Sequence, residues 1–408
     1  MFSVKKTISG ILLILSLGST GCGLPPGPNT APNFATISSQ TIILPNPATG
    51  AINSRNPQIA IDPSGIYVVW EDKTNSNILF SSSTNDGSSF QTPIAIPGSS
   101  GGVFPRIKTD GTGNAYVIWQ SGTRILLNYT TSSAFQTTLQ VSTQAVPFSQ
   151  SGQGGAAPPA DIAYDSGSNS LYVSWTQCST CQANSTINDI YYASIPITNP
   201  LSVSTPVKVT DNTTGAFLGY PKITVFGGIP YMVYQSTIST SGLYLSKATP
   251  PVITSLNVSG SQATASSAAL GVDSSGNSYV SWNPAQSGSD VYFNTLKTNS
   301  PFNSIPVNLS NNGSSYGPAI ALDSSQYVYV AFFSIPGGQT KYDVFLTRTT
   351  NTGSTFSGAF NISNTSGGDS FSYAPGMAIV GKAAYFVWDD NSVTGGNYQI
   401  FFQKVTLN

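Results

Sequence analysis

The side chains that could carry acid–base chemistry are few in this chain. Among its 408 residues there is no histidine, a single glutamate, Glu71, and four arginines. Without histidine there is no Ser-His-Asp triad and no imidazole general base, and the commonest transition-metal ligand is missing. The chain also lacks a glycine-rich phosphate-binding motif between a strand and a helix. We therefore expect neither a bound metal nor a cofactor.

Candidate ligand-binding side chains occur at two kinds of position. Carboxylates directly follow a tryptophan, and arginines and tyrosines lie shortly before an apolar segment. Glu71–Asp72 and Asp389–Asp390 each follow a tryptophan directly. Adjacent side chains on an extended strand point to opposite sides, so Glu71 and Asp72 are not placed to act as acid and base together. Arginines and tyrosines occur shortly before apolar segments, and such groups suit a sugar or peptide ligand. The candidate ligand-binding residues are Arg55, Glu71, Asp72, Arg106, Tyr220, Tyr316, Tyr373, Asp389 and Asp390.

Both recurring positions belong to a unit that the sequence repeats. Its first copy is NPQIAIDPSGIYVVW, from Asn56 to Trp70. A unit that returns about every 50 residues indicates a propeller or another repeat array. We assign its final aromatic residue to core packing, because a buried tryptophan removes about 150–250 Å² of surface from water. The copies end at Trp70, Trp119, Trp175, Tyr234, Trp282, Phe332 and Trp388.

Each unit contains four short segments that are typical of strands. In the first unit they are IAID, IYVVW, ILFSSS and TPIAIP, and the turn DPSG separates the first two. The last unit stops at Asn408 after its third strand, and Gln40–Leu44 near the N-terminus resembles a fourth strand. Pairing of these two ends would close the ring and cover sheet edges. The sequence thus predicts an all-β fold, a single seven-bladed β-propeller of four-stranded antiparallel blades over residues 36–408, closed by the N-terminal strand.

The predicted ring would bring the candidate residues together. Loops between second and third strands, and loops from one blade to the next, should open on the same face. The candidate residues would then surround the mouth of the central channel. The alternative interpretation is that the aromatic residues only separate the blades and the polar groups only contact water.

Two segments carry a family resemblance. Ser83–Phe90 (STNDGSSF) and Thr349–Phe356 (TTNTGSTF) match each other position by position. Both resemble the Asp-box of the sialidase-like (BNR repeat) propellers, Ser-x-Asp-x-Gly-x-Thr-Trp. Asn85 and Asn351 stand where that family has aspartate, and asparagine supports the same Asx-turn. The resemblance implies a propeller fold and a structural role for the box, which faces away from the active site in that family.

The resemblance also implies an alternative activity, sialidase-like glycoside hydrolysis. Sialidases use a tyrosine with a glutamate partner and an aspartate acid/base, for which Tyr373, Glu71 and Asp72 are the candidates here. The Phe-Arg-Ile-Pro element of that family has only a scrambled counterpart, Phe104-Pro105-Arg106-Ile107. Glycoside hydrolysis usually needs a paired acid and base, and the sialidase set is incomplete. We therefore expect a non-catalytic binding or interaction module for a glycan or a protein ligand.

The N-terminus is typical of an exported protein. A positively charged start precedes an apolar run from Ile8 to Leu17, which is short for a bilayer span. The small residues before Cys22 resemble a bacterial lipobox. That resemblance implies a lipoprotein signal peptide over residues 1–21 and acylation of Cys22, with the Pro/Gly-rich segment 22–35 as an extended tether. Because Gly23 follows the cysteine instead of an aspartate, we expect a lipid anchor in the bacterial cell envelope, at the outer membrane, on its periplasmic side or its surface.

The two other cysteines, Cys178 and Cys181, form a CxxC in the expected loop between the second and third strands of blade 3. No further cysteine or histidine is available to complete a zinc site, so we expect a local disulfide in an oxidising compartment.

The net charge of −1 comes without a basic cluster, which excludes a nucleic-acid backbone as partner. We expect a monomer.

Overall fold

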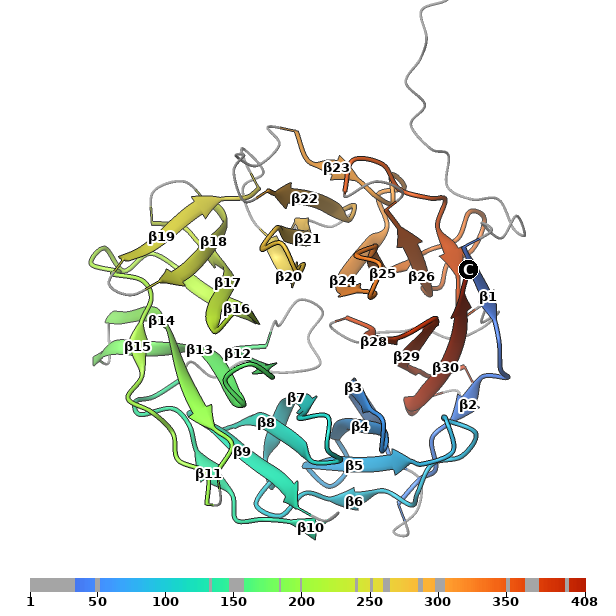
Figure 1. Cartoon of the computed structure of the whole chain (residues 1–408), viewed down its shortest axis with the longest axis horizontal. Helices are drawn as coiled ribbons and strands as arrows, with labels where there is room; N and C mark the ends of the chain where they lie inside the picture. The colour runs from blue at the N-terminus through green and yellow to red at the C-terminus, as the bar shows by residue number, and fades with distance from the viewer. Residues whose placement is uncertain are drawn as a thin grey trace, which may run out of the picture.

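In the computed structural model, the chain forms a ring of β-sheets (Figure 1). The structure describes residues 34–47, 52–131, 134–146, 158–182, 185–198, 200–238, 241–249, 252–259, 265–284, 289–297, 305–349, 353–363, 374–392 and 396–408. Within these residues there are 30 strands and no helix.

Seven antiparallel sheets, the blades, surround a central axis, as the sequence predicts (Figure 1). From the centre outward, blade 1 contains β3 (Ser54–Asp62), β4 (Gly65–Asp72), β5 (Asn77–Ser83) and β6 (Ile94–Ala95). Blade 2 contains β7 (Gly102–Thr109), β8 (Ala115–Ser121) and β9 (Arg124–Thr131), with β10 (Ala134–Phe135) and β11 (Leu139–Gln140) both on β9. Blade 3 contains β12 (Ala160–Asp165), β13 (Ser170–Gln182), β14 (Ser185–Pro196) and β15 (Val207–Lys208).

Blades 4 to 7 continue the ring in chain order. Blade 4 contains β16 (Leu218–Phe226), β17 (Ile229–Ser236), β18 (Gly242–Thr249) and β19 (Val252–Asn257). Blade 5 contains β20 (Ala265–Val272), β21 (Ser278–Pro284), β22 (Tyr292–Leu296) and β23 (Val307–Asn308). Blade 6 contains β24 (Ser315–Leu322), β25 (Val328–Ser334), β26 (Asp343–Arg348) and β27 (Phe360–Asn361). Blade 7 contains β28 (Gly376–Val380), β29 (Ala383–Asp390) and β30 (Gln399–Leu407), with β1 (Ala35–Ile37) and β2 (Ile42–Ile43) on β30.

Clusters of buried apolar side chains fill the interfaces between blades. On β4, Val68 and Trp70 pack toward blade 7, whereas Val69 packs toward blade 2, as the alternation of a strand requires. The final aromatic residue of the repeat is at most 3% exposed in every blade. In blades 3 to 7 it also lies over an aromatic residue of the third strand, for example Trp388 over Phe401 at 5.8 Å between ring centroids. The predicted packing role of this position is confirmed.

The N-terminal strands close the ring. Both β1 and β2 pair antiparallel with β30, with Ile42 opposite Phe402. Phe34 is 2% exposed and Leu44 is 4% exposed, and both belong to buried clusters that include blade 7. The predicted closure is therefore confirmed, and β1 adds a second short strand to it.

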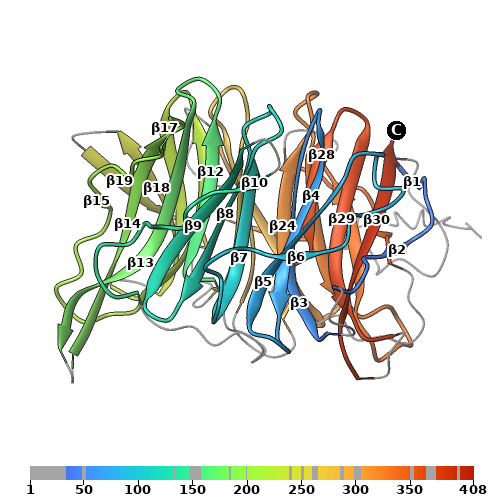
Figure 2. The same cartoon turned by 90° about the horizontal axis from the view of Figure 1, so that it is seen from below.

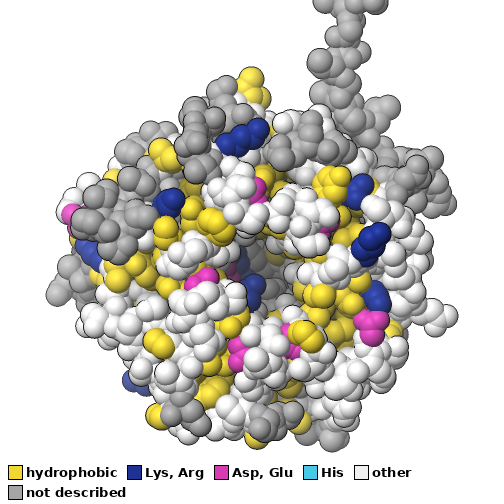
Figure 3. Space-filling model, viewed as in Figure 1, with side chains coloured by type: hydrophobic (Ala, Val, Ile, Leu, Met, Phe, Trp, Pro, Cys, Tyr) yellow, Lys and Arg dark blue, Asp and Glu magenta, His cyan; other side chains and the backbone are white. Residues whose placement is uncertain are grey.

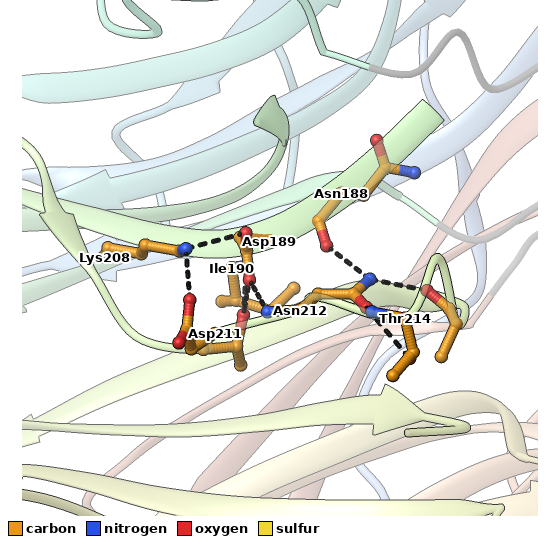
Figure 4. Close-up of polar contacts among 9 residues, drawn as sticks. Asn188, Asp189, Ile190, Lys208, Asp211, Asn212 and Thr214 are labelled. Atoms are coloured by element: carbon orange, nitrogen blue, oxygen red, sulfur yellow. Dashed lines mark hydrogen bonds and ion pairs between the residues drawn. The ribbon is translucent and has the colours of Figure 1, made fainter. Parts of the chain in front are cut away.

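A hydroxyl group after the fourth strand recurs in blades 1 to 6. It accepts the backbone N–H of a buried residue that belongs to the third strand or directly precedes it, at 2.9–3.1 Å. The hydroxyl thus pairs a backbone donor that would otherwise be buried without a partner. In blade 3 the Thr210 hydroxyl in turn donates to Asp189, which also accepts the Asn212 N–H and pairs with Lys208 (Figure 4). The hydroxyls belong to Ser99, Ser142, Thr210, Ser259, Ser310 and Ser363.

The Asp-box-like segment of blade 1 forms a turn in which Asn85 is a side-chain acceptor. Asn85 Oδ1 accepts the backbone N–H of Ser89, four residues later, at 3.0 Å, whereas the expected Asx-turn would bond the residue two positions later. The next residue, Asp86, accepts the Tyr385 hydroxyl at 2.8 Å. The segment therefore connects blade 1 to blade 7. Asn351, at the equivalent position of the second segment, lies outside the described residues.

The fold corrects the expected position of the CxxC. β13 and β14 continue as a paired hairpin, which extends beyond the rest of the ring (Figure 2). Cys178 lies opposite Asn188, and a bulge follows before Thr180, so the cysteines belong to β13 and not to a loop. Continued pairing satisfies backbone groups that a loop would leave to water. Cys178 is disulfide-bonded; the side chain of Cys181 lies outside the described residues, and its pairing stays a prediction.

The closing strands generate a stability prediction. A chain that begins at residue 45 lacks the buried side chains of Phe34 and Leu44 and exposes the edge of β30. Because burial of one such side chain stabilises by about 1.5–3 kcal/mol, we expect a loss of about 3–6 kcal/mol in the free energy of unfolding. Urea unfolding and size-exclusion chromatography should show a lower midpoint and self-association. A chain that begins at residue 34 is the control, and equal midpoints for the two chains would contradict the closure.

Candidate functional site

The first strands of five blades begin with a bulge or another register shift. In four of them the first residue that the pairing skips has a positive φ angle, which is strained for residues other than glycine. These residues are Asn56 (φ 53°), Phe104 (φ 54°), Tyr220 (φ 59°) and Gly317 (φ 65°).

In three blades the backbone N–H at this bulge donates to a side chain of the preceding blade. The acceptor directly follows the final aromatic residue of the repeat. We call these contacts the interblade bonds. They join Asn56 to Asp389 (3.1 Å), Phe104 to Glu71 (2.7 Å) and Gly317 to Asn283 (3.2 Å).

Glu71 is 0% exposed, and the side chain contacts groups of both blade 1 and blade 2. Besides the Phe104 N–H, it accepts the Asn56 side-chain amide at 2.8 Å and pairs with Lys73 at 3.0 Å. The single glutamate thus connects blade 1 to blade 2. A ligand or catalytic role for Glu71 stays a prediction.

Asp72 and Asp390 lie one residue further along, on the opposite side of their strands. Asp72 is 2% exposed and accepts the Thr74 N–H at 2.9 Å; Asp390 is 1% exposed and accepts the Ser392 N–H at 2.7 Å. Both aspartates therefore hold the turns that follow their strands. As predicted, Glu71 and Asp72 point apart, because they contact different parts of the chain.

Arg55 and Asp389 form the centre of a polar and aromatic group at the junction of blades 6, 7 and 1. Arg55 Nε donates to Asp389 Oδ2 at 2.9 Å, and the guanidinium lies 4.1 Å from the centre of the Tyr398 ring. Tyr316 contacts Tyr342 edge-on at 4.9 Å between centroids. Burial, together with the charge of Asp389, raises the pKa of Tyr316 well above its usual value. We call these five residues the Arg55 cluster; Arg55 and the three tyrosines are all partly exposed.

Arg106 lies in a different group, on the inner strands of blades 2 to 4. Its Nε is 3.6 Å from Asp161 Oδ1, and Asp161 Oδ2 accepts the Ile223 backbone N–H at 3.1 Å. Burial and the nearby Arg106 and Lys108 lower the pKa of Lys222 to about 7, against the opposing effect of Asp161. We call Arg106, Lys108, Asp161 and Lys222 the channel cluster. Lys or Arg side chains lie at the wall of the central opening in Figure 3.

The remaining candidates lie apart from both clusters or cannot be placed. Tyr220 packs on the exposed Phe217 at 5.3 Å between centroids, in blade 4. Burial raises its pKa. Tyr373 and Cys22 lie outside the described residues. The structure therefore brings Arg55, Tyr316 and Asp389 together, and separates them from Arg106 and Tyr220.

Sequence analysis missed four residues of these clusters: Tyr342, Tyr398, Lys108 and Lys222. Tyr342 and Tyr398 lie just before third strands, a position we did not consider. Lys222 could have been found by alignment of the repeats, since YPKI (220–223) matches FPRI (104–107). Lys108 follows two residues after Arg106 on the same strand, and so shares its face.

No protein-family model matches the chain, and no curated protein matches its sequence. Among solved structures, the polysaccharide lyase Uly1 aligns over 89% of this chain and 92% of its own, with a TM-score of 0.57 and 8% identity. A protein of unknown function from Dyadobacter fermentans aligns over 92% of this chain and 99% of its own, with a TM-score of 0.52 and 9% identity. At such identities the likeness concerns the fold. Together with the seven sheets of the ring, it shows a seven-bladed β-propeller fold.

Two features are absent from the described residues. No helix there is long and apolar enough to cross a membrane. No group of three or more cysteine, aspartate or glutamate side chains in the same part of the chain could hold a metal ion.

The contacts of Asp389 generate a stability prediction. Asp389→Ala removes an interblade bond and leaves the guanidinium of Arg55 without its carboxylate. Because removal of one partner of a buried pair costs about 3–5 kcal/mol, we expect a loss of that size in the free energy of unfolding by urea. Asp211→Ala is the matched control, since Asp211 also pairs with a cation but its side chain is 83% exposed. Equal midpoints for the two variants would show that the interblade bond contributes little.

Proposed function

We propose that the protein is an exported, lipid-anchored β-propeller that binds a glycan at the mouth of its channel without cleaving it. The Arg55 cluster supports this proposal. It combines three tyrosines, each partly exposed as a residue, with a guanidinium group, contributed by blades 6, 7 and 1. Binding sites of this kind pair aromatic surfaces with a few fixed polar groups.

The geometry of Arg55 favours recognition of sugar oxygens. A guanidinium has five N–H donors in a plane and suits hydroxyl or carboxylate oxygens. Asp389 and the Tyr398 ring fix this plane from two sides, at 2.9 Å and 4.1 Å. A group that is already ordered loses less conformational entropy when a ligand binds.

The contacts of the carboxylates support binding without hydrolysis. Asp389 is ion-paired with Arg55, and Glu71 is buried at an interblade bond. A glycosidase needs one carboxyl group as acid and another as base or nucleophile on either side of the scissile bond. The polysaccharide lyase Uly1 shares the fold, so a saccharide ligand is compatible with this architecture.

A glycan array with the chain from residue 24 tests the proposed binding, with a fluorogenic sialoside as a control for turnover. For a glycan that binds, Tyr398→Ala should weaken affinity about tenfold or more, because loss of an aromatic anchor costs on the order of 2 kcal/mol. Tyr327→Ala is the control, since Tyr327 is 38% exposed at the opposite end of the strands. Absence of any glycan signal, equal effects of the two substitutions, or turnover of the sialoside would each reject the proposal.

The proposed anchor is tested separately, by metabolic labelling with a fatty-acid analogue. We expect label on the wild-type chain, fractionation with the outer membrane, and loss of label in Cys22→Ser. Cys178→Ser is the control and should keep the label. Persistent label in Cys22→Ser would refute acylation at this residue.

A further inference from the structure

Three members of the channel cluster, Arg106, Asp161 and Lys222, occupy equivalent positions of successive blades. In each blade one residue of the first strand lies opposite the residue that precedes the final aromatic of the repeat; Gln58, for example, pairs with Val69. The register assigns seven residues to this position: Gln58, Arg106, Asp161, Lys222, Ala269, Ala319 and Gly376. Polar residues thus occupy this position in blades 1 to 4, and small residues occupy it in blades 5 to 7.

The small residues leave one side of this ring without long side chains. At Gly376 a Cβ atom would lie 2.5 Å from Val387 Cγ2, so the packing of blade 7 requires glycine here. At this position of the first strand, blades 5 to 7 therefore carry no long cationic side chain like those of blades 2 and 4.

Positive charge exceeds negative charge in the channel cluster. Arg106, Lys108 and Lys222 are the three cations, and Asp161 is the carboxylate. Asp161 is shared, because one oxygen faces Arg106 and the other accepts the Ile223 N–H. Arg106 also donates to the Pro105 carbonyl at 3.0 Å, and is 5% exposed. Lys108 is exposed and Lys222 is partly exposed, so the two lysines are the accessible cations.

We propose that Lys108 and Lys222 form an oxyanion-binding site in the wall of the central channel, with Arg106 and Asp161 positioning the strands that carry them. The ligand group is a sulfate, phosphate or carboxylate. Like charges held close together in a partly desolvated wall repel each other, and a bound anion relieves this repulsion. The site is separate from the Arg55 cluster and does not require that the proposed glycan binding is correct.

Binding of the anion and protonation of Lys222 should each favour the other. The charged groups that act on Lys222 within the described residues are Arg106, Lys108 and Asp161. Since its pKa of about 7 lies below the usual 10.5, Lys222 gains its charge as pH falls through 7. Anion affinity should therefore be higher at pH 6 than at pH 8.

Calorimetric titration of the full chain with sodium sulfate, at constant ionic strength in chloride, tests the site. We expect saturable binding to wild type, and weakening of about fivefold to tenfold in Lys222→Gln and in Lys108→Gln. Lys382→Gln is the matched control, because Lys382 is exposed on the turn between β28 and β29. Lys222→Arg should keep the binding and reduce its dependence on pH between 6 and 8. Thermal midpoints of all variants, measured in parallel, distinguish lost binding from lost folding.

A second titration identifies the source of the anion. A sulfated oligosaccharide is compared with its unsulfated counterpart and with inorganic sulfate. Tighter binding of the sulfated sugar assigns the anion to a glycan, and equal binding of inorganic sulfate assigns it to a free ion; both support the site. Absence of saturable sulfate binding, or equal binding to wild type and to folded Lys222→Gln and Lys108→Gln, would overturn it. Sulfate binding without any glycan binding would reject the proposed function alone.

Discussion

The structure depends on the packing of one aromatic side chain at the end of each second strand. Trp70 and its equivalents are almost fully buried between neighbouring blades, where they supply the largest apolar areas of the fold. The following residue is thereby held at the edge of the same interface. In blades 1, 5 and 7 this residue accepts a backbone N–H from the next blade. Hydrophobic contact and blade-to-blade hydrogen bonding are thus specified by adjacent residues, which explains why carboxylates there are buried.

Much of the fold could be predicted, because its signals are local and repeated. The seven aromatic positions, the strand alternation around Trp70 and the likeness of Gln40–Leu44 to a fourth strand together predicted the blades and their closure. The structure confirms these features. The position of Cys178 could not be predicted, because whether a hairpin continues or opens into a loop depends on pairing between two segments whose side chains carry no clear alternation.

The site was harder to predict than the fold. From the sequence, a carboxylate after a tryptophan could equally bind a ligand or accept a hydrogen bond from a neighbouring blade. In the structure Glu71 accepts a hydrogen bond from blade 2. Arg55 and Tyr316 come together only because blades 1 and 6 flank blade 7, which places residues far apart in sequence around one junction. Tyr398, Lys108 and Lys222 could not be identified as site residues from the sequence, because the residues near them belong to other blades.

The origin of the strands of blade 7 constrains how the chain can fold. Its sheet contains strands from both ends, and the Ser38 hydroxyl bonds to Lys404 across 366 residues of sequence. β1 and β2 precede the other strands in the chain, and β30, their partner, follows them all. During synthesis the early strands must therefore remain without their native partner until β30 has been made, and contacts between such distant segments form slowly. Six blades can assemble as the chain lengthens, whereas the seventh is completed only once β30 is present.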